Sequence, residues 1–559
     1  MPFSVDGMEH ERNRLTKLFK DKGYYRFQKD YITFTADTTH HSNNVNLTMN
    51  IALPVYSTAD SIVTHKEFRI GNIYYVCGVG MRYDDEALSK CDTLNYHGYN
   101  IIYKGNTIVR PGVLLENTFF QPGDIYSQSN VDRTYNSFAQ LTAVKYTTIR
   151  MVERPGTSFL DCYIAFERNK RRSVGFELEG TNTAGDLGAA ASITFSDKNL
   201  FKGSEQLSLR VFGAYEAISN LSGYTGNTYL EYGAEVSLRL IGGIPQAFVP
   251  AEKRMLLSSS LFSLKFNTQE RPEFARRILS GSWSYMWSKR KEDQHMIDLI
   301  DLNYIYVPWK SDNFKAYLEN LTDRNSILIK SYEDQLIVRM GYSYIYNSAN
   351  DQTRTSNSRN SYSIRVNLEE AGNLLYAASK AIHSTPKEDK GYVMANIPFA
   401  QYVKGDFDFA HNWNIDHRNS LVFHIGMGIA YPYGNSQVLP FEKRYFSGGP
   451  NSVRGWSVRS LGPGSYKGTN DNMNYINHSG DIKLDMNIEY RTHLFWKFNG
   501  AAFIDAGNIW NIREYEGQEE GTFRFNHFYK QLAVAYGLGI RFDLDYLIIR
   551  FDGGMKAVN

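Results

Sequence analysis

RYFSGGPNSVRGW, at residues 444–456, is the most informative segment of the chain. It interrupts a long series of strand-like segments with a loop in which Gly448, Gly449 and Gly455 lie close to Pro450 and one conspicuous arginine, Arg454. Clusters of glycine and proline mark loops rather than strands. A rigid loop of this kind among membrane-type strands indicates a pore-like protein whose interior holds a tethered plug.

Strand-like alternation surrounds this loop from about Arg172 to the end of the chain. The clearest run is Gln531 to Leu544, where the apolar face has Leu532, Val534, Tyr536, Leu538, Ile540, Phe542 and Leu544, and the other face has Ala533, Ala535, Gly537, Gly539, Arg541 and Asp543. A period of two residues indicates a β-strand. A soluble sandwich would bury the second face against another sheet, whereas a water-filled barrel lumen accepts its charges.

The composition fits membrane strands better than membrane helices. Aromatic residues make up 14% of the 559 residues and hydrophobic residues 42%, and the mean hydropathy is -0.43. A transmembrane helix needs about 20 consecutive, mostly apolar residues, and no such run occurs. Transmembrane strands tolerate a polar average because every second residue faces the lumen. The net charge of +2, from 61 basic and 59 acidic side chains, argues against nucleic acid as a partner.

About fifteen candidate strands follow residue 172, starting near residues 173, 187, 205, 229, 256, 276, 295, 336, 361, 397, 419, 481, 498, 530 and 547. Single-chain bacterial barrels close with an even number of strands, because an open edge in lipid leaves backbone groups unsatisfied. We therefore expect a sixteenth, final strand that is missing after Gly554. No secretory signal is visible at Met1, so we expect a fragment or a processed form of an exported protein.

The first 168 residues have a mixed α and β pattern. Residues 6–23 have an amphipathic helical pattern that ends at Gly23, and strand-like runs follow at 31–36 and 45–53. Residues 64–168 then predict the order strand, helix, helix, strand, strand, at 68–79, 109–119, 130–143, 146–152 and 160–166. Residues 81–106 are expected to be an insertion in this second unit.

Val453-Arg454-Gly455-Trp456 resembles the Val-Arg-Gly-aromatic motif in the sixth extracellular loop of the BamA/TamA outer-membrane assembly superfamily, of the bacterial surface antigen type. Barrels of that superfamily have sixteen strands and carry this loop between the eleventh and twelfth, the same pair of candidate strands that flanks Arg454. The resemblance implies a mainly β fold, with a 16-strand-type transmembrane β-barrel at 172–559 and a lumenal loop at 441–466. It also implies periplasmic α+β POTRA-like domains: the C-terminal half of one at 1–54, with Gly23-Tyr24-Tyr25 where these domains carry Gly-Tyr, and a complete one at 64–168.

Other segments resemble the TamA-like branch of Bacteroidetes-type bacteria, TamL. They are Glu11-Arg12, QPGD at 121–124, EGTNTAGD at 179–186 and NLFKGSE at 199–205. The resemblance implies an outer-membrane factor that inserts or exports other proteins, with no chemical reaction and no cofactor. The implied partners are outer-membrane client proteins, the lipid bilayer and a periplasm-spanning TamB-like protein. The sheet edges of the POTRA-like domains would bind extended partner chains by β-augmentation.

A lumenal Arg454 needs carboxylate partners, because its guanidinium is always charged and pairs with carboxylates in a bidentate geometry. Alternation over 481–491 places Glu489 inward, and in 501–510 the outward Ile504 places Asp505 inward. The superfamily resemblance assigns these same two strand positions as partners of the loop arginine. We expect a latch that holds the loop to the barrel wall. The alternative is an ordinary lumenal salt bridge that only stiffens a plug.

The first barrel strand, near residues 173–183, contains Gly175 and Gly180. The resemblance implies a lateral seam between the first and the last strand, at which an exposed strand edge templates the strands of a client. Strand edges are templates for pairing, and glycine in a strand weakens its pairing. Accommodation of barrel curvature explains the two glycines equally well.

Alternative functions make different demands on the sequence. The common zinc, serine-hydrolase and phosphate-loop patterns do not occur, so we do not expect an enzyme. A passive porin or solute transporter would lack the POTRA-like units, and a two-partner secretion exporter of the same superfamily would need a dedicated secreted client. Cys77 and Cys91 could pair and leave Cys162 free, although three unpaired structural cysteines are the simpler interpretation.

Overall fold

The computed structural model describes residues 5–37, 45–54, 64–80, 85–183, 186–217, 228–242, 258–288, 290–320, 332–350, 360–387, 391–467, 478–515, 518–544 and 546–558. The chain divides into two compact units. The first has residues 1–173, 196–207 and 240–257, and the second has residues 174–195, 208–239 and 258–559. Among the described helices, none has the length and apolar character needed to cross a membrane.

The first unit begins with α1 (Val5–Asp21) and an antiparallel hairpin of β1 (Ile32–Asp37) and β2 (Asn46–Ile51). Gly23 ends the helix with a φ of +98°, a left-handed conformation that favours glycine. A Cβ there would lie 2.6 Å from Cγ of Glu67, so the position also lacks space for a side chain. Asp21 accepts hydrogen bonds from Ser127 and from Ser129, which join the end of α1 to the start of α4 (Gln128–Gln140).

A five-stranded sheet in the order β4-β5-β3-β7-β6 forms the rest of this unit. Its elements are β3 (Arg69–Cys77), α2 (Asp85–Ser89), β4 (Asp92–Tyr96), β5 (Tyr99–Tyr103), α3 (Pro111–Glu116), α4, β6 (Val144–Glu153) and β7 (Phe159–Arg168). The core includes the fully buried Tyr75, Phe138 and Phe166. Residues 81–106, expected as an insertion, contain α2 and the β4–β5 hairpin, and β5 extends the sheet by pairing in parallel with β3.

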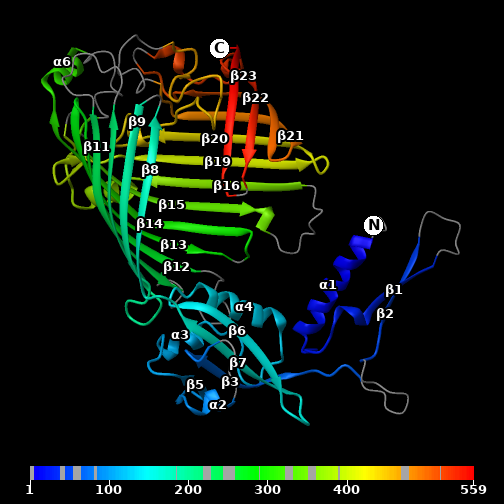
Figure 1. Cartoon of the computed structure of the whole chain (residues 1–559). Coiled ribbons are helices and arrows are strands. Elements are labelled where there is room, and N and C mark those ends of the chain that lie inside the picture. Colours follow the sequence, from blue (N-terminus) through cyan, green and yellow to red (C-terminus); the bar gives the residue numbers. More distant parts are fainter. Residues whose placement is uncertain are drawn as a thin grey trace. The chain divides into compact units, whose positions relative to one another are not determined.

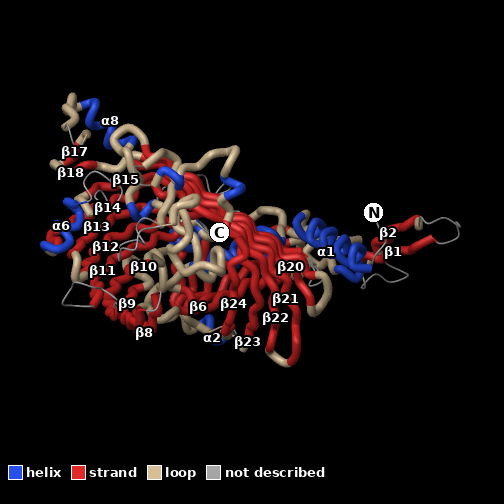
Figure 2. The backbone as a smooth tube through the Cα atoms, turned by 90° about the horizontal axis from the view of Figure 1, so that it is seen from above, coloured by secondary structure: helices blue, strands red, loops and turns tan. Residues whose placement is uncertain are grey.

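The second unit is one antiparallel sheet of 15 strands, with β8 and β24 at its two ends. The strands are β8 (Arg172–Thr183), β9 (Asp186–Asp197), β10 (Gln206–Ala217), β11 (Thr228–Ile241), β12 (Ser259–Glu270), β13 (Phe274–Trp287), β14 (Asp293–Lys310), β15 (Gln335–Asn347), β16 (Asn360–Ala371), β19 (Tyr402–Asn414), β20 (Asn419–Pro432), β21 (Ile482–Phe495), β22 (Phe498–Trp510), β23 (Ala533–Asp543) and β24 (Ile548–Val558). Figures 1 and 2 show the sheet curving round on itself. The predicted number of strands is confirmed, and the largest difference is that β19 begins at Tyr402 rather than near residue 397.

Alternation separates the two faces of this sheet. Outward residues are exposed and apolar, such as Leu178 at 86% and Leu538 at 71% exposure. Inward residues include charged clusters, such as Arg339 of β15 with Asp298, Asp301 and Glu369. The described connections between strands contain α6 (Asp312–Asn320), α8 (Asn373–Ala381) and the short pair β17 (Val393–Met394) and β18 (Ile397–Pro398).

Candidate functional site

The connection between β20 and β21 contains the Val453-Arg454-Gly455-Trp456 motif. Val453 is 0% and Trp456 4% exposed, and together with Leu461 they pack against Ala533 and Ala535 of β23. Gly455 lies so close to β23 that a Cβ there would be 2.9 Å from Cβ of Ala535. The motif is therefore folded against the inner surface of the sheet, and its glycine permits the close approach.

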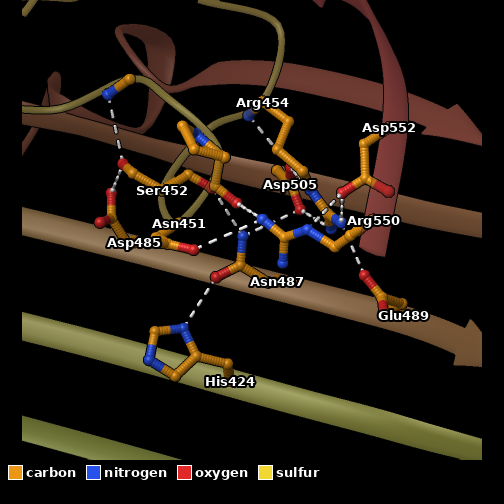
Figure 3. A network of polar contacts seen from close by, with 12 residues as sticks. His424, Asn451, Ser452, Arg454, Asp485, Asn487, Glu489, Asp505, Arg550 and Asp552 are labelled. Carbon is orange, nitrogen blue, oxygen red and sulfur yellow. Dashed lines mark hydrogen bonds and ion pairs between the residues drawn. The ribbon is translucent and has the colours of Figure 1, made fainter. Parts of the chain in front are cut away.

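Arg454 lies between two carboxylates of neighbouring strands (Figure 3). Its Nε and Nη2 donate to Oδ2 and Oδ1 of Asp505 on β22 at 2.7 and 2.8 Å, a bidentate pair, and its backbone N–H donates to Oδ2 at 3.1 Å. Nη1 donates to Oε2 of Glu489 on β21 at 2.6 Å. The guanidinium carbon lies 3.3 Å from the ring centroid of Phe503, so an aromatic face covers it as well.

Burial makes these contacts energetically important. The side chain of Arg454 is 6% exposed, that of Glu489 8% and that of Asp505 0%. An arginine does not lose its proton in a protein, so a buried guanidinium without partners would be very costly. Removing one partner of a buried pair destabilises a protein by about 3–5 kcal/mol. The arrangement can therefore hold the loop in one conformation.

Four further residues of the cluster were not singled out from the sequence: Arg491 on β21, Arg541 on β23, and Arg550 and Asp552 on β24. Asp552 forms ion pairs with Arg454 at 3.2 Å, Arg541 at 3.1 Å and Arg550 at 3.3 Å. Arg541 also donates to Oε1 of Glu489 at 2.9 Å. Alternation places Arg541 on the inward face, but periodicity does not show which inward residues meet.

A layer of polar side chains fixes the position of Asp505. Asn487 donates to Oδ1 of Asp505 and to the carbonyl oxygen of Ser452, both at 2.8 Å. Nδ1 of His424 lies 2.7 Å from Oδ1 of Asn487, and the Ser452 hydroxyl donates to Asp485 at 2.9 Å (Figure 3). Asn487 therefore orients the carboxylate that binds the arginine.

A second buried ion pair fixes the loop near its start. Nη1 of Arg444 lies 3.1 Å from Oδ1 of Asp481, and both side chains are 0% exposed. Nη2 of Arg444 also donates to Oδ1 of Asn511 at 2.6 Å, and Tyr445 donates to Asp406 of β19 at 2.6 Å. No role was expected from the sequence for either Arg444 or Tyr445.

The two seam glycines lie on a different strand from the residues of this cluster. Gly175 and Gly180 lie on β8, at the end of the sheet order opposite to β24. A Cβ added to either glycine would meet no other atom within 4 Å, so close packing does not require glycine at these positions. No group of three or more His, Cys, Asp or Glu residues in the described ranges could hold a metal ion.

Comparison with known proteins agrees with this geometry. The model of the Omp85 superfamily domain matches residues 173–558. The chain is 30% identical over 99 residues to the outer membrane protein assembly factor BamA of Neisseria meningitidis serogroup B, a match that covers 16% of this chain and only 12% of that protein. BamA from Haemophilus ducreyi lacking POTRA domains 1–3 has a similar fold, with a TM-score of 0.56, 12% identity and coverage of 100% of this chain and 91% of that one. CdiB from Acinetobacter baumannii gives a TM-score of 0.43 at 10% identity, covering 100% of this chain and 96% of CdiB. The chain belongs to the Omp85 superfamily and is a β-barrel protein of the bacterial outer membrane with a POTRA-like region.

Proposed function

We propose that this chain inserts other proteins into the bacterial outer membrane or moves them across it, without catalysing a reaction. The observation that carries the proposal is the buried, bidentate pair between Arg454 and Asp505, with Glu489 as a further partner. The effect of this pair is to fix a loop inside the barrel, which is useful to a protein that works by conformation rather than by chemistry.

The proposed route for a client is the seam between β8 and the C-terminal end of the sheet. A strand at such a seam presents N–H and C=O groups that pair with an incoming strand. Glycine in a strand interior weakens the strand through its backbone freedom, so Gly175 and Gly180 would ease movement of β8. The outward residues of β8 are apolar and exposed, with Phe176 at 76%, so a client strand paired there would continue the surface that faces lipid.

The POTRA-like region would deliver clients to this seam. The two outer strands of its sheet are β4 and β6, and each has one edge without a strand partner in the described sheet. An extended segment can add to such an edge through main-chain hydrogen bonds. We further propose the TamA-like branch of the superfamily, with a periplasm-spanning TamB-like partner. Support for this branch comes from the segments at 121–124, 179–186 and 199–205.

Substitution of Arg454 tests the proposal. We expect Arg454→Ala and Arg454→Lys to lower the amounts of client proteins in the outer membrane several-fold, while the variants themselves still accumulate there. Lysine retains the charge but cannot form the bidentate pair, so it should not rescue function. Quantitative proteomics of isolated outer membranes gives both quantities in one measurement.

Arg339→Ala is the matched control, because Arg339 also contacts three inward carboxylates but lies on β15 outside the loop. Unchanged client levels in the Arg454 variants, or equal depletion in Arg339→Ala, would contradict the proposal. A passive porin would be favoured instead by a steady ion conductance of the wild-type protein in planar bilayers, together with unchanged client levels in the Arg454 variants.

A further inference from the structure

The carboxylate of Asp552 closes a ring of alternating charges around the loop arginine. Going round the ring, Arg454 contacts Glu489 at 2.6 Å, Glu489 contacts Arg541 at 2.9 Å, Arg541 contacts Asp552 at 3.1 Å, and Asp552 contacts Arg454 at 3.2 Å. The four side chains are between 6% and 9% exposed. The ring joins the loop to β21, β23 and β24 at once.

Other residues on the same face of β24 also touch the loop. Arg550 donates to the carbonyl oxygen of Pro450 at 2.9 Å. A Cβ on Gly554 would lie 2.6 Å from the carbonyl oxygen of Arg454, and the ammonium of Lys556 lies 5.0 Å from the ring centroid of Trp456. Residues 550, 552, 554 and 556 are alternate positions, so they share one face of the strand. The loop therefore lies along most of the length of β24.

β24 lies at the C-terminal end of the sheet order, the side at which we place the seam. Its outward side chains give it little support, since Phe551 is 70% and Met555 62% exposed. Its described supports are the pairing with β23, from Val534–Val558 to Asp543–Ile548, and the loop on its inner face. A change in the loop must then change the support of β24.

We propose that Asp552 is a positioning residue that couples the loop to β24. While Arg454 and Arg541 hold Asp552, β24 is fixed, and when the loop leaves, Asp552 loses one partner and β24 becomes free to move relative to β23. The inference rests on the proposed function in one respect: the movement of β24 would open the C-terminal side of the seam. The coupling itself is a property of the free protein and needs no client.

Hydrogen–deuterium exchange of the purified protein in lipid nanodiscs tests the coupling. We expect Asp552→Asn to accelerate amide exchange in residues 548–558 by about tenfold, because one buried charge loses its counter-charge, while exchange in β14 (residues 293–310) stays as in the wild type. Asp552→Glu keeps the charge and should restore slow exchange. A residue that only stabilised the whole barrel would accelerate both regions.

Asp301→Asn is the matched control, since Asp301 is an inward carboxylate that pairs with Arg339 at 2.5 Å and lies on β14. Unchanged exchange at 548–558 in Asp552→Asn would overturn the proposal, and so would an equal acceleration there in Asp301→Asn. If Asp552→Asn does not fold, Lys556→Gln tests the contact between the loop and β24 instead, because Lys556 is exposed and its ammonium lies 5.0 Å from the ring centroid of Trp456 in the loop. For that variant we expect faster exchange at 548–558, and an unchanged rate would overturn the proposal. This experiment contains no client. The exchange result can therefore contradict the coupling while the client assay supports the proposed function, and the client assay can fail while the exchange result supports the coupling.

Discussion

At the scale of single residues, the charges around Arg454 nearly balance. The cluster has four arginines, Arg454, Arg491, Arg541 and Arg550, and three carboxylates, Glu489, Asp505 and Asp552. A compact cluster with alternating signs lowers the cost of burying each member, whereas removal of one carboxylate leaves several cations facing one another. Substitution of the carboxylates should therefore be at least as harmful as substitution of Arg454.

Two neighbouring glycines of β24 provide a matched pair for testing the contact between loop and strand. A Cβ on Gly554 would meet backbone atoms of Arg454 at 2.6 and 2.9 Å, whereas the nearest atom to a Cβ on Gly553 lies at 3.9 Å. We expect Gly554→Ala to destabilise the barrel by about 1–3 kcal/mol, as overpacking does, and Gly553→Ala to have little effect. The measurement is the temperature at which the compact, folded band is lost in semi-native electrophoresis. Equal temperatures for the two variants would show that the loop does not lie against β24.

Alternation and the superfamily resemblance together predicted part of the arginine cluster. Alternation within a strand shows which side chains face inward, and the structure has both Glu489 and Asp505 on that face in contact with Arg454. Asp552 lies 98 residues from Arg454 along the chain, and Arg541 lies 52 residues from Glu489. Contacts between such distant residues depend on the register of several strands, and local periodicity does not contain that register.

At the scale of elements, the reactivity of the cysteines in the first unit tests the packing of its sheet. Cys77 on β3 and Cys162 on β7 are buried, Cys91 is partly exposed, and all three are free. Burial raises the pKa of the Cys77 and Cys162 thiols, so little of the reactive thiolate forms near neutral pH. We expect one maleimide adduct per native chain, at Cys91, and three after denaturation, measured by intact mass. Fast labelling of Cys162 in the native protein would show that β7 does not pack as described.

The long barrel strands were predictable, but the short elements of the first unit were not. Strands of eleven or more residues, such as β14 (Asp293–Lys310), show many periods of alternation. β4 and β5 have five residues each, too few for a clear pattern, and β5 joins the sheet through a parallel pairing with β3. The predicted helix at 109–119 extends only over Pro111–Glu116, because a short amphipathic segment gives imprecise ends.

At the scale of the whole barrel, the loop braces one part of the sheet from inside. Lys443 pairs with Glu369 of β16 at 2.8 Å, Tyr445 donates to Asp406 of β19, and Arg454 contacts β21, β22 and β24. Of these contacts, the ion pair of Arg454 with Asp552 reaches β24 at the C-terminal end of the described sheet. On the other side, Gly175 and Gly180 of β8 have open space around them. We therefore propose that the two sides of the seam differ and that β8 is the more mobile one.

This asymmetry predicts where a client meets the barrel. We expect a photo-crosslinking amino acid, p-benzoylphenylalanine, at position 176 of β8 to capture client proteins in living cells, because a strand that pairs with β8 would place its side chains beside Phe176. The same substitution of Leu264 on β12 is the control: Leu264 also faces outward, at 57% exposure, but β12 is paired on both sides. Adducts are identified by mass spectrometry after purification of the tagged protein. Capture of the same clients from both positions would mean that the crosslinks come from non-specific encounters in the membrane. If nothing is captured from position 176, β8 is excluded as the client-binding edge. In the Arg454→Ala background we expect fewer adducts at position 176, because the seam needs its braced C-terminal side to hold a client strand against β8.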